Sequence, residues 1–360
     1  MSDISSKSDN TTSTDKDYAN EINVPNTCQT LPLGQARRNG PFKYGERVQL
    51  TDYKGRMYTF QLIEKGHFTC SRGTIKHHQI EGREEGSVIT SIEGKDFLAL
   101  RPQLCDYVLS MPRGATIVYP KDAAMIIQMG DIFPGAKVLE AGVGSGGLSI
   151  SLLSAIGENG KLISFERREE FAKIAEANVD LWFGARHKAW EVIVGDFASS
   201  VYEKVPAHSF DRVVLDMLDP WENLEAVHYA LRPGGTFISY VATASQMSRL
   251  DEAMKESGLF TKIYPFETFV RPWHLDGLAV RPEHSMIGHT GFIITARTLA
   301  VENEDFTLSR RPANASINKG SQWDEVKDWD NGQIDKRTIS DKKIRKVIRD
   351  LDHKTSKLDT

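Results

Sequence analysis

The sequence predicts an α/β fold, in which helices cover both faces of a doubly wound, mostly parallel sheet, preceded by a small all-β domain. Two observations support this prediction. From about residue 111 to 300, strand-like apolar runs alternate with helical patterns, as they do in parallel sheets flanked by helices. Over residues 38–110, short runs rich in Val, Tyr, Phe, Ile and Thr are separated by glycine-bearing turns, which is typical of a small β-barrel or sandwich.

Each element follows from its own pattern. In the all-β segment we expect strands at 45–50, 56–62, 86–92 and 95–102. In the α/β segment, apolar runs predict strands at 136–142, 161–166, 190–196, 210–216 and 235–241. Apolar residues at helical spacing predict helices at 122–129, 147–156, 168–182, 220–231 and 244–258. No helix separates the runs 262–270 and 288–299, so we expect an antiparallel pair at a sheet edge.

The two ends of the chain differ from this core. Residues 1–37 are polar without an apolar period, and we interpret them as a disordered leader. Residues 301–360 form a polar tail with a basic end, 336–357, where nine basic and three acidic residues give +6. Apolar residues at helical spacing in this basic end are compatible with a short helix that contacts RNA phosphates, but the composition favours a solvated, disordered tail.

Composition limits the class of protein. The 360 residues include 45 Lys and Arg against 49 Asp and Glu. This net −4 does not exclude nucleic acid, because residues 38–110 carry +2 (11 basic, 9 acidic). No apolar run is long enough for a membrane span, and the N-terminus lacks the apolar segment of a signal peptide. Three widely spaced cysteines form no metal or disulfide framework, so we expect a cytoplasmic protein without a metal.

A glycine-rich loop follows the first strand of the α/β segment and opens a helix. Glycines let a ligand approach the backbone there, and the helix N-terminus offers free N–H groups. The loop also satisfies the GxGxxG pattern of dinucleotide sites, which is weak by itself, and a tight turn without a ligand is the alternative. The candidate cofactor contacts in the loop are Gly142, Gly144, Ser145, Gly146, Gly147 and Leu148.

Acidic residues at three successive strand ends select the cofactor. Glu140, just before the first glycine, suits a ligand ammonium. Glu166 ends the second strand, where an acid takes ribose hydroxyls, and Asp196 ends the third, where an acceptor meets an adenine amino group beside Phe197. An amino-acid head, a ribose and an adenine in that order describe S-adenosylmethionine. The alternatives are a helix N-terminal acid for Glu166, a turn former for Asp196, and an NAD-dependent enzyme, which leaves Glu140 unexplained.

The fourth strand ends at Asp216, beside the first strand in a doubly wound sheet. A carboxylate there can accept a hydrogen bond from an exocyclic amino group. It thereby pushes electron density to a neighbouring ring nitrogen and stabilises the cation formed on methylation. We therefore assign Asp216 as the catalytic carboxylate. Asp219, before Pro220, fits a helix cap or a degenerate Asp-Pro-Pro-Tyr signature, and both readings are weaker.

Aromatic and basic residues near the same end are candidates for substrate binding, because a flipped base is held by stacking on rings. We expect the segment 271–282 to be a loop that reaches over the site. The alternative for each ring is a place in the core, and for His289 an ordinary position at the start of a strand. The candidates are Tyr119, Trp221, Tyr240, Trp273, Arg281 and His289.

The chain resembles the bacterial-type tRNA (adenine-58-N1)-methyltransferases, close to their actinobacterial branch, over about 38–300. The motifs that carry the resemblance are DYVLSMPRGA at 106–115, YPKD at 119–122, LEAG with GSG at 139–146, LDM with PW at 215–221, GLAVRP at 277–282 and GHT at 288–290.

The resemblance implies a class I, Rossmann-like S-adenosylmethionine methyltransferase domain behind the β domain, a homotetramer, and methyl transfer to N1 of adenine 58 in the tRNA T-loop. It assigns Asp216 to the target adenine, and Tyr119 and Tyr240 to the target-base pocket. Glu166 would hold the ribose and Asp196 the cofactor adenine, with Phe171 as a wall of that site. A non-catalytic tRNA-binding subunit, or an enzyme that also methylates position 57, remains an alternative.

Overall fold

The computed structural model describes residues 39–300, which form two compact units: the first runs to Leu104 and includes Asp180–Ala185, and the second contains Cys105–Val179 and the residues from Arg186 on. The predicted leader (1–37) and tail (301–360) lie outside the described residues. The domain boundary expected at residue 110 comes later than this division, because helix α1 (Leu104–Ser110) packs mainly within the second unit. There the hydroxyl of Tyr107 donates to the carbonyl of Asn178 at 2.7 Å.

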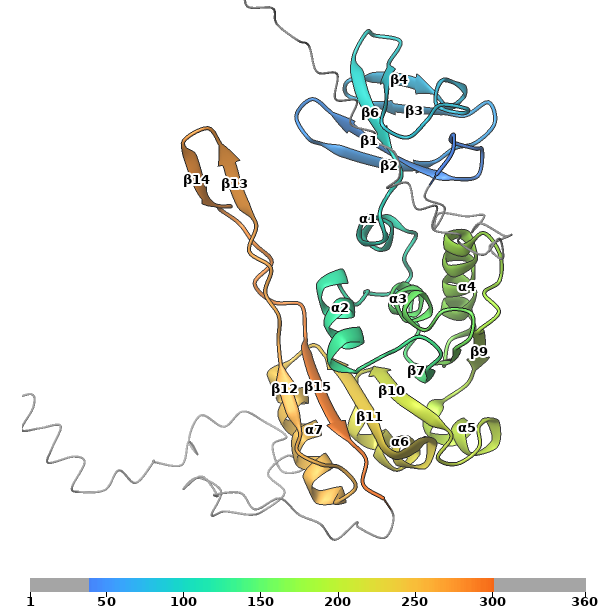
Figure 1. The fold of residues 1–360 in the computed structure, drawn as a ribbon, viewed down its shortest axis with the longest axis vertical. Coiled ribbons are helices and arrows are strands. Elements are labelled where there is room, and N and C mark those ends of the chain that lie inside the picture. Colours follow the sequence, from blue (N-terminus) through green and yellow to red (C-terminus); the bar gives the residue numbers. More distant parts are fainter. Residues whose placement is uncertain (1–38, 301–360) are drawn as a thin grey trace, which may run out of the picture. The chain divides into compact units, whose positions relative to one another are not determined.

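The first unit contains a four-stranded antiparallel sheet in the order β2-β1-β6-β5 (Figure 1). Its strands are β1 (Arg47–Asp52), β2 (Met57–Gln61), β5 (Ser87–Thr90) and β6 (Asp96–Leu100), which match the four predicted runs. The sequence prediction missed the hairpin of β3 (His67–Cys70) and β4 (Gly73–Lys76) and the short helix η1 (His77–Gln79). Buried Val48, Leu50 and Phe97 lie in the core that this sheet covers.

The second unit is built on a seven-stranded sheet in the order β12-β15-β11-β10-β7-β8-β9. The five parallel strands are β7 (Lys137–Ala141), β8 (Lys161–Glu166), β9 (Trp190–Val194), β10 (Phe210–Asp216) and β11 (Leu231–Val241). Each corresponds to a predicted strand, and β10 lies beside β7 as the doubly wound order requires. The α/β fold class is therefore confirmed.

Helices connect these strands (Figure 1). They are α2 (Pro120–Met129), α3 (Gly147–Ile156), α4 (Glu169–Phe183), α5 (Phe197–Lys204), η2 (Pro220–Asn223), α6 (Leu224–Ala230) and α7 (Ala244–Ser257). The five predicted helices are present, but α5 was missed, because it is only eight residues long. Among residues 39–300, no helix has the length and apolar character needed to cross a membrane.

The sheet ends in an antiparallel pair, as predicted. Strand β15 (Phe292–Arg297) pairs with β11, and β12 (Tyr264–Phe266) pairs with β15. The segment between them is not the expected loop but a hairpin of β13 (Trp273–Asp276) and β14 (Ala279–Pro282). A two-residue turn, Gly277-Leu278, explains the hairpin, since Gly277 takes its first central position with a φ of 54°. In Figure 1 this hairpin projects away from the sheet; we call residues 268–290 the arm.

Candidate active site

The carboxyl ends of three adjacent parallel strands bring the predicted glycine loop and two predicted acids to one edge of the sheet. Strand β10 pairs in register with β7, and β7 with β8. The residues that end or follow the paired runs, Asp216, Gly142 and Glu166, therefore lie at successive places along this edge. It is the edge at which doubly wound sheets bind ligands.

Gly142 is required by the close approach of β7 and β10. A Cβ atom at this position would lie 1.8 Å from the carbonyl oxygen of Asp216, and the φ of Gly142 is 90°. No side chain fits there, and an L-residue rarely adopts that φ. The first glycine of the loop thus sets how closely the catalytic strand end and the loop lie together.

Hydrogen bonds to the side chain and to the backbone of Ser145 fix the rest of the loop. The hydroxyl of Ser145 accepts hydrogen bonds from the backbone N–H groups of Gly114 and Ala115, at 3.2 and 3.3 Å. The Asn178 amide donates to the Ser145 carbonyl at 2.9 Å. Gly146, in the left-handed region, precedes the first turn of α3, which begins with the buried residues Gly147 and Leu148. The loop is held ready for a ligand.

Glu140 is a fully buried carboxylate with one oxygen that lacks a partner. Its Oε2 accepts from the hydroxyls of Ser149 at 2.7 Å and Ser164 at 2.6 Å. Its Oε1 is buried and has no hydrogen-bond partner among the described residues. Burial raises the pKa of Glu140 to about 7. Neither serine stood out in the sequence, because their role depends on the contact across β7, β8 and α3.

Glu166 and Asp216 add two carboxylates to this edge. Glu166 Oε2 accepts from the N–H of Gly144 at 3.1 Å, and its Oε1 from the Arg168 N–H at 3.1 Å. Burial, with a smaller contribution from Glu166, raises the pKa of the half-buried Asp216 to about 7. Each raised pKa reports a site where negative charge is poorly compensated by the protein alone.

These residues fit S-adenosylmethionine, which carries a sulfonium and an ammonium group. The buried Oε1 of Glu140 is an acceptor suited to the ammonium, and three nearby carboxylates favour a cationic ligand. Glu166 also accepts from the guanidinium Nε of Arg168 at 3.3 Å, which leaves about one of its four acceptor positions for a ribose hydroxyl. A positive ligand would also lower the two raised pKa values.

Asp196 has a structural task in addition to its predicted cofactor contact. It caps the N-terminus of α5, where its Oδ2 accepts from the N–H of Ser199 at 3.2 Å. Its Oδ1 lies 3.7 Å from the guanidinium of Arg167. The turn-forming alternative from the sequence is therefore present, and a contact with adenine stays a prediction.

The two predicted phenylalanine contacts differ. Phe197 is 2% exposed, and its ring packs edge-on against Phe165 at 5.3 Å. Its side chain thus packs in the core, and its contact with the cofactor adenine stays a prediction. Phe171 is half-buried and has the Arg168 guanidinium 3.7 Å from its ring centroid. Its role as a cofactor wall stays a prediction.

The substrate-binding candidates do not gather in one place. Trp221 packs against the core with the Arg249 guanidinium 4.3 Å from its ring centroid, and its contact with the substrate stays a prediction. Trp273, 56% exposed, and Arg281 lie on the hairpin that projects from the sheet (Figure 1), and their contact with the substrate stays a prediction. His289 Nε2 bonds the Ala242 carbonyl at 2.7 Å, which gives it a structural role.

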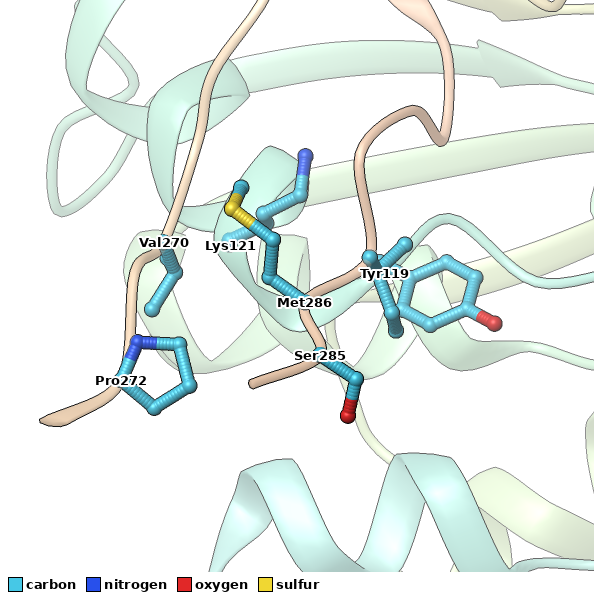
Figure 2. A pocket seen from close by; sticks show the side chains of 7 residues that line it. Tyr119, Lys121, Val270, Pro272, Ser285 and Met286 are labelled. Carbon is cyan, nitrogen blue, oxygen red and sulfur yellow. The ribbon is translucent and has the colours of Figure 1, made fainter. Parts of the chain in front are cut away.

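The two predicted tyrosines flank the start of α2. Tyr119 precedes that helix and lines a pocket of about 440 Å³ (Figure 2). The pocket is lined by Tyr119, Lys121, Val270, Pro272, Ser285, Met286 and Ile287. Tyr240 is 7% exposed and lies opposite Asp216 in the neighbouring strand. Its hydroxyl donates to Asp122 at 3.3 Å, a residue the site prediction missed because an acid in a first helical turn is common.

Comparison with known proteins agrees with this geometry. Residues 40–89 match the TrmI-like N-terminal family, and residues 97–277 match the family described as the tRNA methyltransferase complex GCD14 subunit. The tRNA (adenine(58)-N(1))-methyltransferase TrmI of Thermus thermophilus is 33% identical over 69% of this chain and 95% of its own. A Methanocaldococcus jannaschii relative, named as a tRNA (adenine(57)-N(1)/adenine(58)-N(1))-methyltransferase, is 33% identical over 69% and 93%.

Solved structures are similar in the same region. The tRNA (m1A58) methyltransferase TrmI of Aquifex aeolicus has a TM-score of 0.64 and 29% identity, and covers 72% of this chain and 100% of its own. An S-adenosylmethionine-dependent O-methyltransferase of Thermotoga maritima has a TM-score of 0.68 and 30% identity, with 72% and 96% covered.

Fold, glycine loop and edge carboxylates define a class I methyltransferase with S-adenosylmethionine as its cofactor. Within that class, the chain belongs to the TrmI and GCD14 family of tRNA methyltransferases. The family predicted from the sequence is confirmed, and its actinobacterial branch stays a prediction.

Proposed function

We propose that this protein transfers the methyl group of S-adenosylmethionine to N1 of adenine 58 in tRNA. The observation that carries the proposal is the position of Asp216, a carboxylate at the cofactor edge with a raised pKa, held against the glycine loop. The relatives named for this reaction, which align with most of this chain, support it.

The cofactor and the protein contribute different parts of the reaction. The bound cofactor supplies an electrophilic methyl group. The Asp216 carboxylate accepts a hydrogen bond from the adenine amino group, which orients the ring and raises the electron density at N1. It also stabilises the positive charge that develops on the methylated ring. No general base is needed, because N1 is unprotonated near pH 7 and has no proton to lose.

The charge of the site favours the active form of Asp216. Without a ligand, its pKa of about 7 leaves the carboxyl group partly protonated at neutral pH. A cation bound beside it lowers that pKa, so ionised Asp216 and a bound cofactor favour each other. Glu140 and Glu166 hold the cofactor at this edge through its ammonium group and its ribose.

The first unit offers a surface suited to RNA. Tyr53 is 75% exposed in the turn after β1, with the Arg72 guanidinium 4.1 Å and the Lys54 ammonium 5.7 Å from its ring centroid. Buried Asp52 fixes the turn by accepting from the N–H of Lys54 at 2.8 Å and pairing with Arg72 at 2.7 Å. An aromatic ring beside cations binds bases and phosphates without reading sequence. We assign tRNA contacts to this turn.

Of the two alternatives, one is supported by a specific observation and the other is disfavoured by the site. Methylation of position 57 as well is favoured by the printed name of the M. jannaschii relative. A non-catalytic tRNA-binding subunit would have no need of Glu140, Glu166 and Asp216 together. A homotetramer and action in the cytoplasm complete the proposal as predictions from the resemblance.

The test is methyl transfer from labelled S-adenosylmethionine to an unmodified tRNA transcript carrying adenine at 57 and 58. Transcripts with guanine at 58, at 57, or at both serve as matched controls. The proposal predicts that guanine at 58 removes label incorporation. Label that persists with guanine at 58 alone or at 57 alone, and disappears only with guanine at both positions, would favour the dual specificity, and no label in any transcript would reject the proposal.

A further inference from the structure

The carboxylate of Asp122 lies at the centre of a buried polar cluster. It is 0% exposed, and each of its oxygens accepts two hydrogen bonds. Oδ1 accepts from the Lys121 ammonium at 2.6 Å and the Thr268 hydroxyl at 2.8 Å. Oδ2 accepts from the Thr290 hydroxyl at 2.6 Å and the Tyr240 hydroxyl at 3.3 Å. This carboxylate therefore has all its acceptor positions filled and none left for a ligand.

The same cluster joins three elements that are distant in sequence. Lys121 also donates to the Thr268 carbonyl at 2.9 Å and the Thr290 hydroxyl at 2.7 Å. Thr268 and Thr290 are the first and last residues of the arm. Asp122 and Lys121 thus fix both ends of the arm to the first turn of α2, and Asp122 also fixes the end of β11 through Tyr240.

Tyr240 connects this cluster to the proposed catalytic carboxylate. It lies opposite Asp216 in the paired strands β10 and β11. Gly291 leaves room for the ring, since a Cβ atom there would lie 2.4 Å from it. Burial, and then the Asp122 carboxylate, raises the pKa of Tyr240, so its hydroxyl stays protonated and donates to Asp122. The hydrogen bond to Asp122 therefore fixes the position of the Tyr240 ring beside Asp216.

The arm also forms the walls of the pocket in Figure 2. Val270 and Pro272 follow Thr268 closely, and Met286 and Ile287 come shortly before Thr290. Its volume of about 440 Å³ falls within the range of small-molecule sites. Because both walls begin at bonds to Lys121 and Asp122, this pair sets the separation of the walls.

We propose that Asp122 is a positioning residue, which holds Tyr240 beside Asp216 and sets the arm walls before the target base arrives. The inference rests on the proposed methyl transfer, and it assigns Asp122 no contact with the reacting atoms. A buried ion pair adds little net stability compared with apolar residues, but it specifies one arrangement. Here that arrangement is the one that links the arm, Tyr240 and the strand end of Asp216.

The test is a double-mutant cycle on the full-length protein with Asp122→Asn, Tyr240→Phe and both together. We measure kcat, KM for tRNA, and S-adenosylmethionine affinity, which also reports the folded fraction. Asp122→Asn is expected to lower kcat about 10–100-fold, the effect of misplacing a substrate by about 1 Å, and to change cofactor affinity less than twofold. The double variant is expected to be no more than about threefold slower than Asp122→Asn, because both changes break the same bond.

Asp276→Asn, which removes an exposed carboxylate from the arm itself, is the matched control and should behave as wild type. Thr290→Val removes one donor to Asp122 and one acceptor of Lys121 without burying a new polar group, and should lower kcat in the same direction by a smaller factor. Multiplying effects in the double variant, or wild-type kcat and KM in both Asp122→Asn and Thr290→Val, would overturn the inference. Wild-type transfer to adenine 58, measured first, decides the proposed function separately.

Discussion

Glu140→Gln separates a cofactor contact from a packing role, because the structure predicts opposite effects on binding and stability. The glutamine keeps one oxygen for the hydroxyls of Ser149 and Ser164. It places an NH₂ group where the buried, unpartnered Oε1 stands. A donor then faces the cofactor ammonium, and the charge-assisted hydrogen bond is lost.

The magnitude follows from that one bond. A hydrogen bond to a charged group contributes about 1.5–3 kcal/mol. At about 1.4 kcal/mol per tenfold, the Kd for S-adenosylmethionine should rise roughly 10–150-fold. At pH 8 the cofactor-free variant should unfold at the same or a higher temperature than wild type, since a buried carboxylate with a pKa of about 7 is ionised there at a cost.

Isothermal titration and thermal unfolding at pH 8 make both measurements on one preparation. Glu191→Gln, an exposed glutamate on β9, is the matched control and should leave the Kd unchanged. A Kd within twofold of wild type for Glu140→Gln would refute the assignment of Oε1 to the ammonium. Loss of both affinity and stability would show that Glu140 acts through packing.

Three further predictions concern the same site and the first unit. Because the folded pKa values of Glu140 and Asp216 are raised to about 7, the folded state binds more protons than the unfolded state between about pH 4 and 7. The stability that these protons contribute is thus lost as pH rises through 7. In urea unfolding without cofactor, the free energy of unfolding should therefore decrease less between pH 5 and 8 in the double variant Glu140→Gln/Asp216→Asn than in wild type. Equal decreases would contradict the raised pKa values. Gly142→Ala should cost at least about 2 kcal/mol of unfolding free energy by strain and overpacking, whereas the open Gly135→Ala loses only what its positive φ demands; chemical denaturation compares them. Tyr53→Ala should weaken tRNA binding roughly 5-fold or more through lost stacking with cofactor affinity unchanged, while equal tRNA affinity in filter binding would remove this turn from the account.

The residues at strand ends were predictable because their position depends only on local pattern and sheet order. Once five strands alternate with helices, the parallel register brings Asp216, Gly142 and Glu166 to one edge. Glu140 and Asp216 stood out from the sequence as carboxylates that a simple turn does not need. Their surroundings, which raise the pKa values, follow from burial that periodicity also predicts.

Contacts between distant segments were not predictable in the same way. Asp122 carries an ordinary helix-start pattern, and its partners Thr268 and Thr290 lie 146 and 168 residues away. The contact of the Trp221 ring with Arg249 of α7 likewise depends on packing between segments and has no local sequence signal. The hairpin within 271–282 had a local sequence signal, the dipeptide Asp276-Gly277. The prediction of a loop gave more weight to the many cations and aromatic rings of that segment.

The most direct test of the central claim is single-turnover methyl transfer by Asp216→Asn at saturating S-adenosylmethionine, with the modified base mapped in an unmodified tRNA. Wild type should place the methyl group at adenine 58. The variant should bind the cofactor within a few-fold of wild type and transfer about 10²–10³ times more slowly, the usual cost of removing one preorganised electrostatic contact. Near-wild-type transfer by Asp216→Asn, or a wild-type product at another base, would contradict the account.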